Sequence, residues 1–238
     1  MHTKRSELAG VTLSMHTIKL DRFFLVALAL LLVSSQAIAQ SLNYEVDITN
    51  TKSKRASVTL RPQKLAAKKV TFQMPAWAPG AYSVTNYGRF VKDFKAIDKK
   101  GKELKVTQIN QNRWEIANAQ SLDKITYDVI DSHRDSTSLW FAMAHIDSML
   151  FFANGTALYG YVNDKKNVPA TVTYKLPNDW EVATAAEYAK TRSTRDCAFR
   201  ENVFKAKNYD ELVDYPAIAS RELQTRCFDH DGAHYEVV

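Results

Sequence analysis

Asn43-Tyr44-Glu45-Val46-Asp47-Ile48-Thr49 is the stretch that decides the fold, because apolar and polar residues alternate along it without a break. Side chains of a β-strand point alternately to its two faces, so this pattern predicts a strand with one buried and one solvated face. The same two-residue period recurs in runs that contain Val58, Val70, Leu104, Trp114, Ile125 and Val172. Many short strands of this kind predict an all-β fold, an antiparallel β-sandwich.

Turn dipeptides separate these runs, as at Pro79-Gly80 and Asn163-Asp164. Helix signals are sparse. The best one lies near the C-terminus, where Asn208 can cap a helix and Glu211 can reach back to its first turn, before Pro216 ends it. The apolar residues of 138–152 fit neither the strand nor the helix period. The sequence therefore predicts a single β-sandwich domain with one short helix near the C-terminus.

The first 39 residues have the pattern of a leader with a secretory signal peptide. Lys19 and Arg22 give a basic start, Phe23–Val33 is an unbroken apolar run, and Ala37-Ile38-Ala39 supplies the small residues that precede a cleavage site. A membrane anchor is the alternative, but a span needs about 20 apolar residues, and this run is shorter. We therefore expect an exported protein, periplasmic or secreted, with no membrane contact after cleavage.

The start and the cleavage site of this leader each have two candidates. Translation can begin at Met1 or at Met15, and cleavage can follow Ala39 or Gln40. The predicted organisation is residues 1–39 as leader and signal peptide and residues 40–238 as the β domain.

Composition excludes several classes of protein. The chain is 45% hydrophobic and 24% charged with only 7 Gly and 6 Pro, which is typical of a folded globular protein. Its formal net charge is +6, but the Lys and Arg residues are scattered and form no basic stripe with interleaved aromatics. Nucleic acid is therefore not an expected partner.

Export also bears on the two cysteines, Cys197 and Cys227. In an oxidising compartment a pair of this kind usually forms a disulfide, which would tie down the C-terminal third of the chain. Two buried thiols are the alternative.

One histidine pair resembles a metal motif. In His230-Asp231-Gly232-Ala233-His234 the two histidines are four apart, as they are in zinc-binding helices. However, Asp-Gly is a strong hairpin-turn dipeptide, and the acidic residue is Asp where the zinc-protease motif has Glu. We interpret the stretch as a turn between two strands, with a zinc hydrolase as the disfavoured alternative.

Two other histidines, His133 and His145, lie near four aspartates, Asp128, Asp131, Asp135 and Asp147. Their spacings match no known ligand pattern, so we expect solvated loop charges and no metal site. No Gly-x-Ser-x-Gly elbow and no glycine-rich phosphate loop occurs in the sequence. We also interpret Asn154-Gly155-Thr156 as a turn and not as a glycosylation site. The sequence thus predicts no catalytic, cofactor-binding or metal-binding residue.

The most distinctive stretch is Pro75-Ala76-Trp77-Ala78-Pro79-Gly80-Ala81-Tyr82. Pro79 and Gly80 suit the two central positions of a type II turn, because Pro fixes its φ angle and Gly tolerates a positive one. Trp77 and Tyr82 flank this turn. We expect them to pack together as a buried aromatic corner, with a docking loop for a neighbouring domain or a ligand as the functional alternative.

Five segments in this order resemble the N-terminal domain of the glycyl aminopeptidases, the zinc metallopeptidases of peptidase family sixty-one. The first is the Pro75 stretch, which continues through Arg89 to Val91. The others are Gly101-Lys102 with Trp114, Phe151–Thr156, Pro177–Thr184 and Asn208–Pro216. Together they cover nearly all of residues 40–238.

The resemblance implies a protein in which this β domain precedes a thermolysin-like helical domain with a His-Glu-x-x-His zinc site, often followed by a PDZ module. This chain would then be the first part only, and not an enzyme by itself. It would support a catalytic metallopeptidase domain, present in cis or in trans, which would hold the zinc. Its candidate docking or cleft-wall residues, beside a possible peptide substrate, are Trp77, Pro79, Gly80, Tyr82 and Arg89.

A stand-alone periplasmic binding module is the alternative, in which the corner at Trp77 and Tyr82 holds a ligand. We expect exposed aromatics on one rim to favour this module, and a buried Trp77 to favour the supporting domain.

Overall fold

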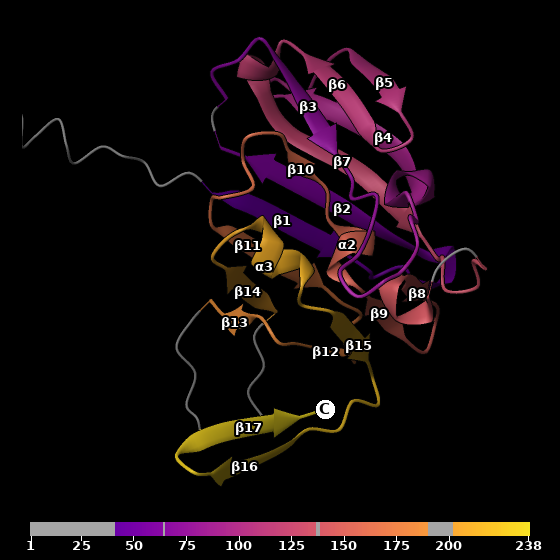
Figure 1. Cartoon of the computed structure of the whole chain (residues 1–238), viewed down its shortest axis with the longest axis vertical. Coiled ribbons are helices and arrows are strands. Elements are labelled where there is room, and N and C mark those ends of the chain that lie inside the picture. Colours follow the sequence, from indigo (N-terminus) through magenta and orange to yellow (C-terminus); the bar gives the residue numbers. More distant parts are fainter. Residues whose placement is uncertain (1–40, 64, 137–138, 190–201) are drawn as a thin grey trace, which may run out of the picture. The chain divides into compact units, whose positions relative to one another are not determined.

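The computed structural model describes residues 41–63, 65–136, 139–189 and 202–238 (Figure 1). All of them belong to one unit, Gln40–Val238. Within these residues no helix is long and apolar enough to cross a membrane.

The largest sheet has seven strands in the order β13-β14-β11-β1-β2-β7-β4. Their bounds are Glu187–Tyr188, Val203–Ala206, Ala170–Lys175, Leu42–Asp47, Arg55–Pro62, Leu122–Ile130 and Val91–Asp98. Six of the seven predicted strand runs lie in strands of this sheet or of a neighbouring one. In the seventh, Leu104 precedes the strand, which begins at Val106. The predicted all-β fold is confirmed.

One pairing in this sheet departs from the antiparallel prediction. Strands β1 and β11 run parallel, with Tyr44 opposite Val172, whereas the other pairs are antiparallel. A parallel pair needs a long crossover connection. Here the connection runs from β1 to β11 and includes most of the other strands, so no local pattern of residues could show the pairing.

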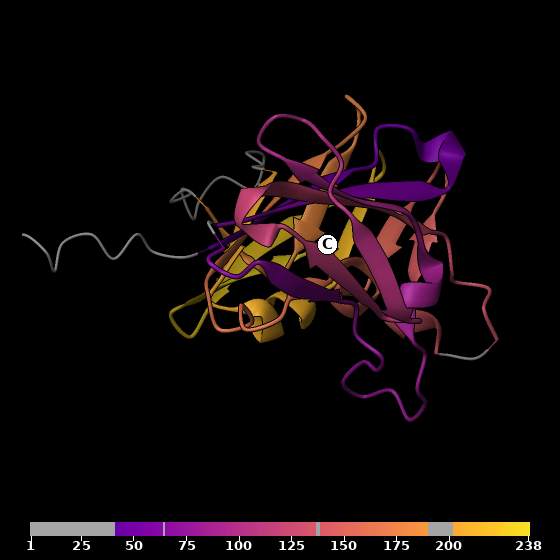
Figure 2. The same ribbon diagram turned by 90° about the horizontal axis from the view of Figure 1, so that it is seen from above.

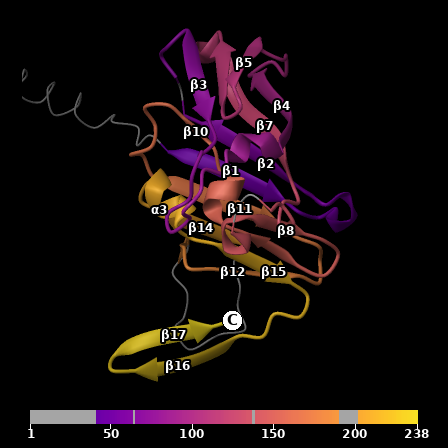
Figure 3. The same ribbon diagram turned by 45° about the vertical axis from the view of Figure 1, so that its right-hand side comes forward.

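Two four-stranded sheets cover the same face of the large sheet. The first has the order β10-β3-β6-β5, with bounds Tyr161–Val162, Lys69–Gln73, Arg113–Ala117 and Val106–Asn110. The second has the order β12-β15-β9-β8, with bounds Glu181–Thr184, Ala217–Ser220, Phe151–Ala153 and Ala144–Ile146. Figure 3 shows β3 and β5 near the β4–β7 end of the large sheet and β12 and β15 near its β14 end.

Aromatic contacts join each small sheet to the large one. Phe72 of β3 packs against Phe94 of β4 and Tyr127 of β7, with ring centroids 5.1 and 5.3 Å apart. At the other end, Phe151 of β9 meets Tyr174 of β11 at 6.3 Å. The alternation seen in the sequence explains this arrangement, because β1 buries Leu42, Tyr44 and Val46 and leaves the residues between them partly or fully exposed.

The predicted C-terminal helix is present as α3, Tyr209–Val213. Asn208 caps it, since its Oδ1 accepts a hydrogen bond of 2.8 Å from the Glu211 N–H. The Glu211 carboxylate reaches back and accepts a hydrogen bond from the Lys207 N–H.

A second short helix, α2 (Gly155–Leu158), replaces the turn predicted at Asn154-Gly155-Thr156. Asn154 is its N-cap and accepts hydrogen bonds from the Thr156 N–H and hydroxyl, at 3.0 and 2.6 Å. The prediction was wrong because a capping asparagine and a turn asparagine have the same local sequence. The ambiguous segment ahead of it contains strands β8 and β9 and a 3₁₀ turn, Trp140–Ala142.

A buried tyrosine cluster holds the segment that leaves α2. Three consecutive carbonyl oxygens each accept a hydrogen bond from a tyrosine hydroxyl: Leu158 from Tyr127 (3.1 Å), Tyr159 from Tyr209 (2.7 Å) and Gly160 from Tyr44 (2.8 Å). The Gly160 N–H donates to the Tyr127 hydroxyl at 3.1 Å. The Tyr159 hydroxyl lies 2.6 Å from that of Tyr174. The segment is therefore fastened to β1, β7, α3 and, through the Tyr159 side chain, β11.

Burial raises the pKa of all five phenols of the tyrosine cluster above the usual value of about 10, because the charged phenolate loses its hydration. At neutral pH each phenol is therefore uncharged and able to donate its hydrogen bond.

We expect Tyr127→Phe to lower the free energy of unfolding by about 1–3 kcal/mol, because it leaves the buried Leu158 carbonyl and Gly160 N–H without their partner. Urea denaturation of the full chain measures this. Tyr82→Phe is the matched control, since Tyr82 is 99% exposed and should change stability by less than about 0.5 kcal/mol. Equal effects of the two substitutions would contradict the role of the cluster.

Candidate functional site: an exposed aromatic loop

The residues between β3 and the 3₁₀ turn Tyr87–Phe90 form a closed loop, residues 75–86, called the aromatic loop below. Its two ends are joined by backbone hydrogen bonds: the Thr85 and Asn86 N–H groups each donate to the Ala76 carbonyl at 2.9 Å, and the Tyr87 N–H donates to that of Pro75 at 3.1 Å. The loop projects from the sheets in the view from above (Figure 2). Its shape is therefore fixed at the base.

The predicted turn lies at the tip of this loop. Gly80 has φ +78°, and the Ala81 N–H donates to the Ala78 carbonyl at 3.0 Å, as a type II turn at Pro79-Gly80 requires. Both alanines are buried, at 0% and 2% exposure. They anchor the turn to the domain.

The predicted burial of Trp77 and Tyr82 is wrong. Trp77 is 49% exposed, Tyr82 99% and the nearby Val84 65%. The loop buries Ala78 and Ala81 and exposes its aromatic side chains. The Trp77 Nε1–H donates to the Ala81 carbonyl within the loop. A closed loop that presents large apolar side chains to solvent is a candidate contact surface.

Arg89 fastens the aromatic loop to the chain that follows β7. Its Nε donates to the Thr85 carbonyl at 2.9 Å, and its two terminal nitrogens donate to the Asp135 carboxylate at 2.9 and 2.8 Å. Such a two-point contact fixes orientation as well as distance. Arg89 therefore braces the loop, and its guanidinium group is already engaged in contacts within the domain.

The segment after Asp135 adds two apolar side chains that the sequence did not single out. Leu139 is 41% exposed and Trp140 72%. They lie in residues 138–152, whose apolar residues fit neither the strand nor the helix period. A tryptophan that no predicted strand or helix accounts for was the one sign in the sequence that these residues are exposed.

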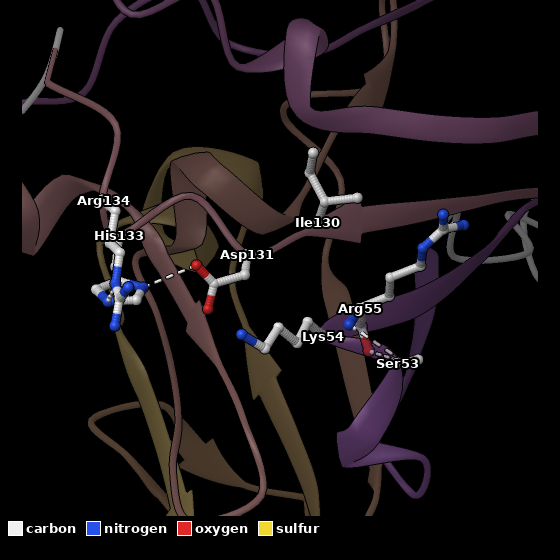
Figure 4. Close-up of a pocket in the computed structure, with 7 residues that line it drawn as sticks. All are labelled: Ser53, Lys54, Arg55, Ile130, Asp131, His133 and Arg134. Atoms are coloured by element: carbon white, nitrogen blue, oxygen red, sulfur yellow. Dashed lines mark hydrogen bonds and ion pairs between the residues drawn. The ribbon is translucent and has the colours of Figure 1, made fainter.

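The structure brings together His133, His145 and two of the four aspartates, contrary to the expectation of separate solvated charges. The His133 Nδ1 lies 2.7 Å from an Asp131 oxygen, and the His145 Nε2 lies 3.0 Å from an Asp147 oxygen. Asp131 points toward His133 in a pocket also lined by Lys54 and Arg134 (Figure 4). Sequence spacing missed this cluster because β7 and β8 bring its two halves together.

The other two aspartates have partners elsewhere. Asp128 accepts hydrogen bonds from Ser57 and Arg55, at 2.7 and 3.3 Å, and Asp135 pairs with Arg89.

The pKa of Asp147 is lowered, because its carboxylate accepts hydrogen bonds from the backbone N–H groups of Met149 and Leu150. The contact with Met149 has the larger effect.

The interpretation of His230 and His234 as flanks of a hairpin is confirmed. They lie in β16 (Arg226–His230) and β17 (Ala233–Val237), joined by Asp231 and Gly232 with φ angles of 49° and 77°. Positive φ at both positions is the type I′ requirement that an Asp-Gly pair meets. The two histidines therefore lie in opposite strands and do not share a helical face, and the His234 ring bonds to Asp229 at 2.8 Å.

Cys197 lies outside the described residues, so the disulfide between Cys197 and Cys227 stays a prediction.

Comparisons with known proteins bear on the family and on the fold of this chain. The family model of the peptidase M61 N-terminal domain matches residues 43–221. Among solved structures, an aminopeptidase N family protein from Idiomarina loihiensis has the same fold, with a TM-score of 0.71 and 23% sequence identity. The match covers 82% of this chain and 32% of that one, so this chain spans about a third of that protein's length. No curated protein sequence matches.

The fold and the site define a β-sandwich domain that presents a braced aromatic loop. The family match extends over most of the chain, and the chain therefore belongs to the peptidase M61 family, as its N-terminal domain. The resemblance seen in the sequence is confirmed.

We expect Gly80→Ala to lower the free energy of unfolding by about 1–2 kcal/mol, because an L side chain at positive φ is strained. Among the described residues no heavy atom lies within 4 Å of the added Cβ, so the cost comes from the backbone. Gly80→Asn should cost less, since asparagine tolerates this conformation. Denaturation curves of both variants test this; no loss of stability in Gly80→Ala would contradict the turn assignment.

Proposed function

We propose that this chain is a non-catalytic N-terminal domain of an exported zinc metallopeptidase, which supports the catalytic domain and walls one side of its substrate cleft. The catalytic domain would hold the zinc and carry out hydrolysis, in cis or in trans. The aromatic loop would be a contact surface, with Trp77 and Tyr82 as its exposed anchors, Pro79 and Gly80 as its turn and Arg89 as its brace.

The observation that carries this proposal is the exposed apolar surface of a domain whose family is peptidase M61. Large apolar side chains in one closed loop are unusual on a soluble domain that has no partner. The solved structure with this fold is consistent with a larger protein, since this chain spans about a third of its length.

The hairpin β16–β17 gives support that is independent of the family match, because it lies beyond residues 43–221, which the family model covers. Most residues of both strands are exposed, on either face. Phe228 and Tyr235 stack on each other with centroids 5.0 Å apart, yet remain 51% and 43% exposed. In the part of the chain that the structure describes, no third strand joins this hairpin, and a two-stranded hairpin by itself is only marginally stable in water. A neighbouring domain would supply a covering layer.

The exposure of Trp77 bears also on the alternative, a stand-alone periplasmic binding module. By the criterion set from the sequence, exposed aromatics favour this module. A docking loop for another domain needs the same exposure, however, so the criterion does not separate the two functions. They differ in the partner: the module binds a small ligand by itself, and the supporting domain binds a protein surface.

We expect the full chain to form a complex with a separately produced M61 catalytic domain that has the His-Glu-x-x-His site. The double variant Trp77→Ser/Tyr82→Ser should weaken this complex at least about tenfold, because buried aromatic anchors carry most of the energy of a protein interface. Affinity is measured by light scattering and calorimetry, with aminopeptidase turnover of the mixture as a second readout.

The matched control is Ile109→Ser, which removes an apolar side chain that is 56% exposed on β5 and should leave the affinity unchanged. No complex with the wild-type chain, or equal binding by the double variant, would contradict the proposal. In that case, quenching of the tryptophan fluorescence by an unblocked glycine-containing tripeptide, seen in the wild-type chain and lost in Trp77→Phe, would support the binding module.

A further inference from the structure

Three side chains, two just after β7 and one in β8, lie close enough to share one metal ion. Asp131 and His133 follow β7, and His145 lies in β8. One ligand atom of each lies within 4.8 Å of the other two. The two imidazole rings meet edge to face, with centroids 4.0 Å apart. Ligands around one zinc ion stand about 3–4 Å from each other, given bonds of about 2.0–2.2 Å, so small side-chain shifts would complete the geometry.

The backbone holds these residues in place. The Ser132 N–H donates to the Ala144 carbonyl at 2.8 Å, and the Ala144 N–H donates back to the Ser132 hydroxyl at 3.1 Å. The Ile146 N–H donates to the Asp131 Oδ2 at 2.8 Å. The segment after β7 is thus fastened to β8 on both sides of the cluster, which makes the site rigid.

Asp147 orients His145 in the manner of an outer carboxylate. It lies 3.0 Å from Nε2 of that ring, and the Nδ1 atom faces the Asp131 Oδ2 at 3.8 Å. In the neutral imidazole that donates from Nε2 to Asp147, Nδ1 is the atom that would bind a metal ion. Carboxylate–histidine–metal arrangements of this kind are frequent in zinc sites.

Nearby cations set a limit on affinity. Lys54, Arg55 and Arg134 line the same pocket. The charge of Arg55 is balanced by Asp93 and Asp128, at 2.8 and 3.3 Å. The Arg134 Nε donates to the His133 Nε2 at 3.3 Å, so metal binding at Nδ1 of His133 requires this ring to move its proton to Nε2 and to release Arg134.

We propose that Asp131, His133 and His145 form a binding site for one divalent transition-metal ion, with zinc the best suited. Two imidazoles and a carboxylate are ligands that zinc accepts. The three side chains are 17–30% exposed, which leaves room for water to complete the coordination. The site is independent of the zinc that the proposed catalytic partner would hold.

The test uses the full chain, dialysed against a chelator and titrated with ZnCl₂ in competition with a chromophoric zinc chelator. We expect one zinc ion per chain. His133→Gln and His145→Gln should each weaken binding at least about tenfold. Asp147→Asn, which removes only the outer carboxylate, should weaken it about 10- to 100-fold.

His234→Gln is the matched control, because His234 is a histidine of the hairpin that also contacts an aspartate, and it should not change zinc affinity. Circular dichroism confirms that each variant is folded; a variant that is not is left out, and the remaining two decide. No zinc binding by the wild-type chain, affinity unchanged in the folded variants, or loss of binding in His234→Gln would overturn the proposal.

Discussion

The chain leaves α2 at Leu158 and passes through the interior without regular secondary structure at Tyr159 and Gly160, so the backbone polar groups of Leu158–Gly160 must find partners there. Three buried tyrosines, Tyr44 of β1, Tyr127 of β7 and Tyr209 of α3, supply or receive these hydrogen bonds. The Tyr159 side chain adds a hydroxyl–hydroxyl contact with Tyr174 of β11. An unpaired backbone group in such a place would cost about 1–3 kcal/mol. The tyrosine cluster therefore lets one connection pass from α2 to β10, and so lets both small sheets cover a single face of the large one.

The packed interior also fixes the shape of the aromatic loop on the surface. The aromatic loop begins after β3, whose Phe72 packs on Tyr127 of the cluster, and it is closed by bonds to Ala76 and braced by Arg89. Since Ala78 and Ala81 are buried and the aromatic side chains are exposed, binding to a partner would need little rearrangement. A preformed surface loses less conformational entropy on association, which suits a domain that supports another.

Sequence alternation was enough to predict the β-sandwich, because strands such as β1 and β2 bury every second residue and leave the others partly or fully exposed. The Asn208 cap and the Pro79-Gly80 turn were equally readable, since each depends on neighbouring residues only. The parallel β1–β11 pair and the cluster of His133 with His145 were not, because distant segments meet there. The exposure of Trp77 was missed because local sequence does not show that Ala78 and Ala81 take the buried positions.

The central claim, that uncharged buried tyrosines hold the interior together, is tested most directly by titrating the full chain with alkali. The folded-state pKa of these phenols is raised, so their contribution is complete below about pH 10 and is lost as the pH rises above that value, where the unfolded chain releases protons first. Phenolate absorbance at the ultraviolet band is followed together with circular dichroism. The account predicts that five of the 11 tyrosines ionise only as the fold is lost; ionisation of all 11 with the circular dichroism signal intact would contradict it.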